Sequence, residues 1–327
     1  MITRRTFLTA LTAASFCLGA AGQVAAQPYP TRLIKLVVPG PPGGPSEIVV
    51  RTLAERLSSS LGQTVIVENR PGGANGTIGA QSVARSERDG YTLLFSMPGP
   101  MVVAPAVYRN LGYDPVKSFA PIATIFSSPQ MLALNPAVPA RTVQELIEYA
   151  KANPGKINFA SPGYGSQPHL LGEMLRLTAG IDILHVPYRG PGLAVTDLLA
   201  GQVQMEFETL PILLPHIEAG KLRALAIADT TRNPQLPDVP TTIESGVPTL
   251  QATFWSGVLA PAATPKSIVD KLNAAINEIL RSKEIETILA RLSAKPKIGS
   301  PQDFAAFVAA ESQKWTAVVN AAGIKAD

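Results

Sequence analysis

The chain has 327 residues, of which 46% are hydrophobic and 16% are charged, and its formal net charge at pH 7 is +4. This length fits two domains or one large α/β domain. The sequence contains no cluster of lysine and arginine with interleaved aromatic residues, so we expect no binding to nucleic acid.

The first 26 residues have the features of an export signal. Arg4 and Arg5 form a twin-arginine pattern, and the mildly apolar run over 7–21 that follows is too short for a good membrane span. Small residues end at Ala26, as a signal peptidase requires. We therefore expect residues 1–26 to be a signal peptide that directs the chain to a bacterial periplasm by the twin-arginine route and is cleaved near Ala26. A retained N-terminal anchor is the alternative.

Loss of this segment would change the chemistry of the mature chain. The net charge would fall from +4 to +2 with Arg4 and Arg5, so the basic balance does not indicate a basic patch. Cys17 is the only cysteine, so we expect neither a disulfide nor thiol chemistry after cleavage.

The mature chain opens with a strand, a glycine-rich loop and a helix. Residues 33–38 form a β-branched apolar run, 39–45 are rich in proline and glycine, and an apolar residue then recurs every four positions from Val49 to Leu61. Free N–H groups at a helix start, together with the helix dipole, favour an anion, and glycine lets the backbone approach a ligand. An ordinary strand-to-helix turn is the alternative.

The next segments predict a largely parallel sheet covered by helices. We expect strands at 64–68 and 91–95, a loop at 69–76 and a short helix at 77–84. Ligands bind at the carboxyl ends of strands in such sheets. Gly43, Gly44 and Ser96 would all lie there.

A second unit repeats this arrangement. A strand is expected at 131–134, and a helix follows the predicted capping box of Thr142 and Glu145. The strand at 157–160 then enters a Gly/Ser loop at 161–168 and a further helix. The two loops, about 120 residues apart, could face each other across a cleft between two domains, and this pairing favours the binding interpretation of the first loop.

The remaining elements complete two domains. In the strand expected at 203–210, Glu206 and Glu208 alternate with apolar residues and are expected to line a solvated face, the alternative being a contact to a cationic or hydroxyl group of a ligand. Residues 254–260 carry the chain back to the first domain. Three helices follow, of which the first and last are expected to be capped by Thr264-Pro265 and Ser300-Pro301.

Several of these stretches together resemble one family. They are Val-Val-Pro-x-Pro-Pro-Gly-Gly-Pro (37–45), Val-Glu-Asn-Arg-Pro-Gly (67–72), Asp-Gly-Tyr-Thr-Leu-Leu (89–94), the 158–170 loop, His-Val-Pro-Tyr-Arg-Gly (185–190) and Leu-Ala-Pro-Ala-x-Thr-Pro (259–265). The chain resembles the substrate-binding proteins of tripartite tricarboxylate transporters, the Bug-type receptors. The resemblance covers nearly the whole mature chain. It implies an α/β, two-domain periplasmic binding protein fold of type II, with domain 1 at 27–126 and 252–327 and domain 2 at 127–251.

The resemblance also implies a binding site for a small carboxylate in the interdomain cleft. The first wall would be formed by Pro42, Gly43, Gly44, Ser46 and Glu47. The second wall would be formed by Ser161, Gly163, Gly165 and Ser166, with Ser96 as the floor and Tyr188, Arg189 and Glu208 as flanks. The family usually has Asp at positions 47, 204 and 208 and an apolar residue at 206, so these positions bear on which carboxylate is bound.

Other chemistries find little support. His169, His185 and His216 have no metal-ligand spacing, and we expect them to be helix-start or packing residues. Ser166 lies near His169, but neither sits in a nucleophile elbow. Arg189 could clamp a carboxylate or lie exposed at a rim. Trp255 and Trp315 are expected in the core.

The expected function is therefore that of a monomeric receptor without a cofactor. It would bind a citrate-like acid, an acidic amino acid or an aromatic acid and pass it to a large and a small membrane subunit. A ligand sensor without its own transporter is the alternative. An enzyme is disfavoured because no catalytic constellation is evident.

Overall fold

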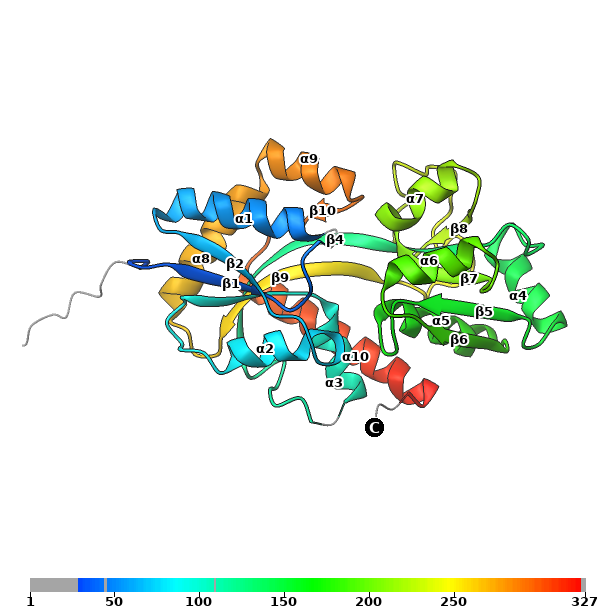
Figure 1. The fold of residues 1–327 in the computed structure, drawn as a ribbon, viewed down its shortest axis with the longest axis horizontal. Helices are drawn as coiled ribbons and strands as arrows, with labels where there is room; N and C mark the ends of the chain where they lie inside the picture. The colour runs from blue at the N-terminus through cyan, green and yellow to red at the C-terminus, as the bar shows by residue number, and fades with distance from the viewer. Residues whose placement is uncertain (1–28, 44–45, 109, 325–327) are drawn as a thin grey trace, which may run out of the picture.

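The computed structural model describes residues 29–43, 46–108 and 110–324, so the expected signal peptide, its cleavage site and Gly44 lie outside the described residues. Two lobes lie side by side along the longest axis of the molecule (Figure 1). They are joined by two long strands, β4 (Phe119–Leu134) and β9 (Thr253–Pro261), which pair with each other antiparallel. The mixed α/β architecture confirms the predicted fold class.

The sheet of the first lobe has the strand order β2-β1-β3-β9-β4. Its first three strands are parallel, β9 runs antiparallel to β3, and the short β10 (Lys295–Pro296) pairs with β4. The bounds of the parallel strands are Ile34–Val38 for β1, Val65–Asn69 for β2 and Thr92–Ser96 for β3. β1 and β2 are each followed by a helix, as the sequence predicts.

Helices cover both faces of this sheet (Figure 1). One face carries α1 (Ser46–Leu61), α8 (Lys266–Leu280) and α9 (Lys283–Arg291). The other carries α2 (Thr77–Ala84), the π-helical turn η2 (Gly99–Val103), α3 (Ala104–Val107) and the long C-terminal α10 (Pro301–Ala322).

The sheet of the second lobe is built around the far end of β4. Residues 130–134 of β4 pair with β7 (Met205–Thr209) on one side, and residues 131–134 pair with β8 (Arg223–Ile227) on the other. The strands β5 (Ile157–Ser161) and β6 (Ile183–Pro187) complete the sheet. Its helices are α4 (Val143–Ala152), α5 (Gln167–Ala179), α6 (Pro191–Leu199) and α7 (Leu210–Glu218).

The length of β4 was not predicted. The sequence indicates a strand only at 131–134, whereas β4 begins twelve residues earlier, at Phe119. Pro121 and Pro129 interrupt the alternation that marks a strand, and the pairing with β9 shifts register after Pro121 and again after Thr124. The irregular position at Pro121 tolerates proline, because a missing N–H breaks no regular ladder there. The proposed domain boundary at 126/127 thus falls inside a continuous strand.

A single hydrophobic core runs through both lobes on one side of the molecule. Phe304, Val308 and Trp315 of α10 lie in the same buried cluster as Leu94 of the first lobe and Leu170 of the second. The exposed fraction of both Trp255 and Trp315 is 0%, which confirms that they are core residues. We infer that α10 ties the lobes together along this side.

The burial of β7 corrects one expectation. Glu206 and Glu208 do not line a solvated face, because their exposed fractions are 0% and 5%. Their neighbours across the sheet are Ala133 and Met131 of β4, which belong to the apolar cluster beneath α6 and α7. Alternation along a strand marks two faces, but it does not say whether helices cover the polar one.

The expected helix caps are only partly present. Ser300 and Asp303 form a full capping box at α10. At α4, Thr142 accepts from the N–H of Glu145, but the Glu145 carboxylate accepts from Arg141 instead of closing the box. Thr264 does not cap α8; its hydroxyl donates to the carbonyl of Pro261.

Within the part of the chain that the structure describes, no helix combines the length and apolarity needed to cross a membrane.

Candidate functional site

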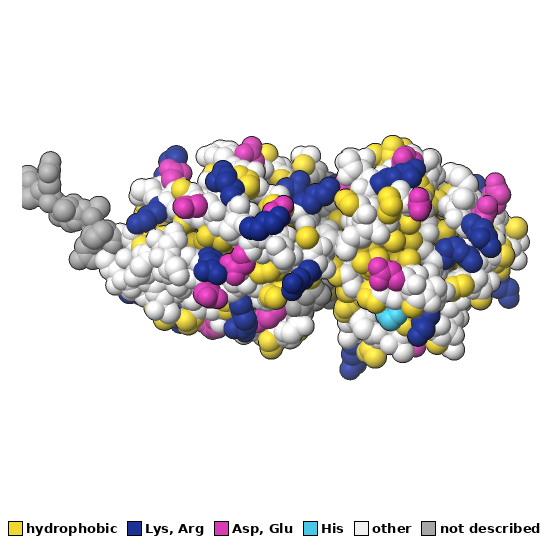
Figure 2. Space-filling view, turned by 90° about the horizontal axis from the view of Figure 1, so that it is seen from above, with side chains coloured by type: hydrophobic (Ala, Val, Ile, Leu, Met, Phe, Trp, Pro, Cys, Tyr) yellow, Lys and Arg dark blue, Asp and Glu magenta, His cyan; other side chains and the backbone are white. Residues whose placement is uncertain are grey.

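A cavity of about 520 Å³ lies between the two lobes. Figure 2 shows the lobes meeting at an indentation, with basic and acidic side chains scattered over this face rather than gathered by sign. The first lobe contributes loop residues at 39–41, 72–76 and 97–100, and the second contributes residues at 166–168, 190–191 and 208–212. The connecting strands β4 and β9 supply Phe126, Ser128, Gln130 and Phe254.

Five helices begin at this cavity. The residue that starts or precedes each helix lines it: Ser46 for α1, Gly76 for α2, Ser166 for α5, Gly190 for α6 and Thr209 for α7. The N–H groups of a first helical turn have no partner within the helix, and the helix dipole adds partial positive charge there. The arrangement therefore favours an anion in the cavity.

The side chains around the cavity supply no positive charge. Among the lining residues in the described ranges there is no lysine, arginine or histidine, and Glu208 is the only charged residue. A bound anion would therefore be held by neutral donors. Phe126, Phe254, Ile212 and Leu292 add apolar surface for the uncharged part of a ligand.

Three predicted site residues line the cavity, namely Ser46, Ser166 and Glu208. From the first loop, the cavity is lined by Pro39, Gly40 and Pro41 together with Ser46, and not by the predicted Pro42 and Gly43.

Gly43 and Glu47 line a shallower neighbouring hollow instead. The Glu47 carboxylate forms an ion pair of 2.5 Å with Arg51 and accepts a hydrogen bond from Asn69 at 3.4 Å. Pro42 is exposed and lines neither the cavity nor the hollow formed by Gly43 and Glu47.

The other predicted residues lie behind the cavity wall or beside it. Ser96 is fully buried and its hydroxyl donates to the carbonyl of Met97 at 3.4 Å. Tyr188 donates to Asp197 at 2.7 Å, and Arg189 is exposed and does not line the cavity.

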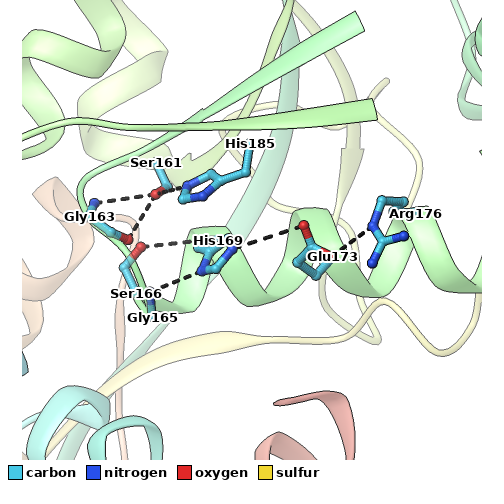
Figure 3. Close-up of polar contacts among 8 residues, drawn as sticks. All are labelled: Ser161, Gly163, Gly165, Ser166, His169, Glu173, Arg176 and His185. Carbon is cyan, nitrogen blue, oxygen red and sulfur yellow. Dashed lines mark hydrogen bonds and ion pairs between the residues drawn. The ribbon is translucent and has the colours of Figure 1, made fainter. Parts of the chain in front are cut away.

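Ser161, Gly163 and Gly165 belong to a hydrogen-bonded support beneath the second loop (Figure 3). The Ser161 hydroxyl lies 2.7 Å from His185 Nε2 and also bonds Gly163. The Gly165 N–H donates to His169 Nδ1 at 2.9 Å, which requires that nitrogen to be unprotonated. These residues fix the loop that presents Ser166 to the cavity.

The two histidine rings in this support stack on each other, with centroids 3.7 Å apart (Figure 3). Burial lowers the pKa of His185 to about 4, and burial together with His185 lowers the pKa of His169 to about 3. Both rings are thus neutral at pH 7. Within the described ranges no group of three or more potential metal ligands occurs.

The sequence did not reveal several residues at the cavity. Asn75, in the predicted 69–76 loop, adopts a left-handed backbone with φ of 54°, and its Nδ2 donates across the cleft to the carbonyl of Gly165 at 3.2 Å. Gln130 donates to Gln167 at 3.1 Å, and Gln167 donates to the carbonyl of Thr253 at 3.1 Å. The Asn-Gly pair at 75–76 was the available signal for a tight turn, whereas the glutamines carry no local signal.

The acidic pair on β7 is strongly perturbed. Burial raises the pKa of Glu208 to about 7, although hydrogen bonds from the N–H and hydroxyl of Thr209 oppose the rise. Burial and the proximity of Glu208 raise the pKa of Glu206 to about 9. Neither oxygen of Glu206 has a hydrogen-bond partner among the described residues. Glu206 is therefore protonated at pH 7.

Known proteins resemble this architecture over most of their length. The family model described as "Tripartite tricarboxylate transporter family receptor" matches residues 49–324. The chain belongs to this receptor family. The protein BugT of Bordetella pertussis is 41% identical over 308 residues, which cover 94% of each chain.

Two solved structures of receptor relatives carry bound acids. Rpa4515 of R. palustris, with adipate, is 37% identical, with a TM-score of 0.81 over 91% of this chain and 100% of that one. MatC of Rhodopseudomonas palustris, with bound malate, is 33% identical, with a TM-score of 0.76 over 89% of this chain and 100% of the other. The fold is that of the periplasmic binding proteins, as predicted. Membership of this receptor family confirms the expectation that the protein is not an enzyme.

Proposed function

We propose that this receptor binds a small organic carboxylate in the cavity between its lobes and delivers it to the large and small membrane subunits of a tripartite transporter. The observation that carries the proposal is the convergence of five helix starts on a cavity that lacks cationic side chains. Backbone N–H groups at the helix starts and the hydroxyls of Ser46 and Ser166 would hold the carboxylate oxygens. The acids named with Rpa4515 and MatC support the same ligand class.

The continuous strands β4 and β9 would act as the hinge. Closure of the lobes over the ligand would exclude water and strengthen the hydrogen bonds to the carboxylate. The proposed domains, 27–126 with 252–327 and 127–251, would be the moving bodies. The relatives of known structure include a periplasmic binding protein. We infer that this chain is exported to the same compartment by its twin-arginine leader.

Thermal unfolding tests the proposal directly. Purified protein without residues 1–26 would be heated with each member of a panel of mono-, di- and tricarboxylic acids and with the corresponding primary amides. A ligand that binds only the native state raises the melting temperature, because it stabilises that state by RT ln(1 + L/Kd), where L is the free ligand concentration. We expect at least one acid to raise the melting temperature by several degrees while its amide does not. A shift with sugars but with no carboxylate would refute the proposal.

A further inference from the structure

Glu208 holds an unusual position for a residue in a site that would bind an acid. It is the only charged side chain among the described cavity-lining residues, and only 5% of it is exposed. Its Oε1 accepts from the N–H and the hydroxyl of Thr209 at 2.6 and 3.0 Å. Both of these bonds go to Oε1, so Thr209 does not engage Oε2. A second ligand carboxylate placed here would meet a negative charge or an acid proton and no cation.

Gln130, which lines the same cavity, carries an acceptor without a partner among the described residues. Gln130 is 1% exposed, and its Nε2 donates to Gln167 Oε1. Because Gln167 Nε2 donates to the carbonyl of Thr253, the orientation of both amides is set. Gln130 Oε1 is therefore left as a buried acceptor with no partner in the described chain. Buried polar atoms are nearly always paired, so this atom, on a residue that lines the cavity, can accept from a donor that a ligand brings.

Among the described residues that line the cavity around Glu208, none carries a positive charge. Adjacent on the same strand is Glu206, which is fully buried and, being protonated, carries no charge. Tyr188 is engaged by Asp197 through its hydroxyl. The carboxylate of Glu208 is thus available to pair with a cation from outside the chain. Such a pair in a buried site is strong, because both the charge and the hydrogen bond contribute.

We propose that the ligand is a zwitterion, a small carboxylic acid that also carries an ammonium group, with its carboxylate at the helix starts and its ammonium group on Glu208. This inference rests on the proposed function and narrows it to one class of acid. Gln130 Oε1 would accept a second ammonium hydrogen. A plain diacid would leave both acceptors without a donor.

Matched ligand pairs test the inference. Binding would be measured by calorimetry for aspartate against succinate, glutamate against glutarate, and phenylalanine against 3-phenylpropionate, with malate as the hydroxyl analogue of aspartate. We expect at least one amino acid to bind ten or more times more tightly than its partner without the amine. Equal or tighter binding of the acids that lack the amine would overturn the inference while leaving the proposed function intact. Preference for malate over aspartate would also overturn it, in favour of a neutral donor.

Two variants locate the ammonium group. Glu208→Gln keeps the size of the side chain but removes its charge, and we expect it to weaken binding of the preferred amino acid at least tenfold. Glu218→Gln, at the exposed end of α7 and outside the cavity, is the matched control and should leave Kd unchanged.

The paired acid without the amine should bind Glu208→Gln no more weakly than the wild-type protein. Unchanged amino-acid affinity in Glu208→Gln would overturn the assignment. If no carboxylate in the panel bound at all, the proposed function would fail and this inference with it.

Discussion

Asn75 and Gly165 connect the two lobes directly, through a hydrogen bond of 3.2 Å from the Asn75 side chain to the Gly165 carbonyl. Asn75 lines the cavity and Gly165 lies next to Ser166, which lines it from the other side. The bond therefore joins the two lobes beside the cavity.

Loss of this bond should lower the affinity for the ligand more than it lowers the stability of the fold. Asn75→Gly removes the donor but suits the left-handed backbone at this position. We expect the affinity for the preferred acid to fall about tenfold, which corresponds to about 1.4 kcal/mol. The melting temperature without ligand should change little. Calorimetry and thermal unfolding measure the two effects. Asn75→Asp also lacks the donor, so wild-type affinity in that variant would contradict the role of the bond.

Substitution of Gly165 should abolish binding. Its φ is 67°, a conformation that β-branched residues rarely adopt. Gly165→Val should therefore displace the loop that presents Ser166, at a cost in stability of about 1–2 kcal/mol. Circular dichroism should show a folded protein, and calorimetry should show no binding. Unchanged affinity would move the site away from this loop.

The acidic pair on β7 should make the protein less stable as pH rises. The folded-state pKa of Glu206, about 9, exceeds the ordinary value, so the folded state retains a proton that the unfolded state loses above about pH 4.5. Stability is therefore lost from about pH 4.5 up to pH 9. Glu206→Gln should match the wild-type protein at pH 4 and exceed its free energy of unfolding at pH 8 by about 1 kcal/mol or more.

Urea unfolding at both pH values measures this difference. If the free energies of unfolding of Glu206→Gln and the wild-type protein differed by the same amount at both pH values, the Glu206 carboxyl would not titrate differently in the folded and unfolded states.

The histidine pair should act in the opposite direction. The folded-state pKa values of His169 and His185, about 3 and 4, lie below the ordinary 6.5, so the unfolded state takes up protons first as pH falls. The stability they contribute is complete above about pH 6.5 and is lost below it. Between pH 6.5 and 5, His185→Gln should therefore lose less free energy of unfolding than the wild-type protein, by up to about 1.4 kcal/mol per pH unit.

Glu173 and Arg176 lie near His169 and should be unaffected by the substitution at 185. Urea unfolding of His169→Gln gives the corresponding value for the second ring. A pH dependence identical to that of the wild-type protein in both variants would mean that neither ring is held neutral by the fold.

The sequence predicted those features that are set by residues close together in the chain. The start of α10 was predicted from Ser300 and Pro301 and is confirmed, because a cap acts within one helical turn. The stacking of His169 on His185 and the pairing of Gln130 with Gln167 could not be predicted. Those residues are brought together only by the packing of α5 against the sheet. Glu206 was misinterpreted because its alternation is the same whether helices or water cover that face.

The position of α10 also bears on how the protein folds. This helix is the last element of the chain, yet it supplies Trp315 and Phe304 to a core that both lobes share. A chain that ended before Pro301 would leave that core uncovered in the first lobe and in the second at once. The lobes should therefore gain their stability together, in one cooperative transition completed only when the C-terminal residues are in place.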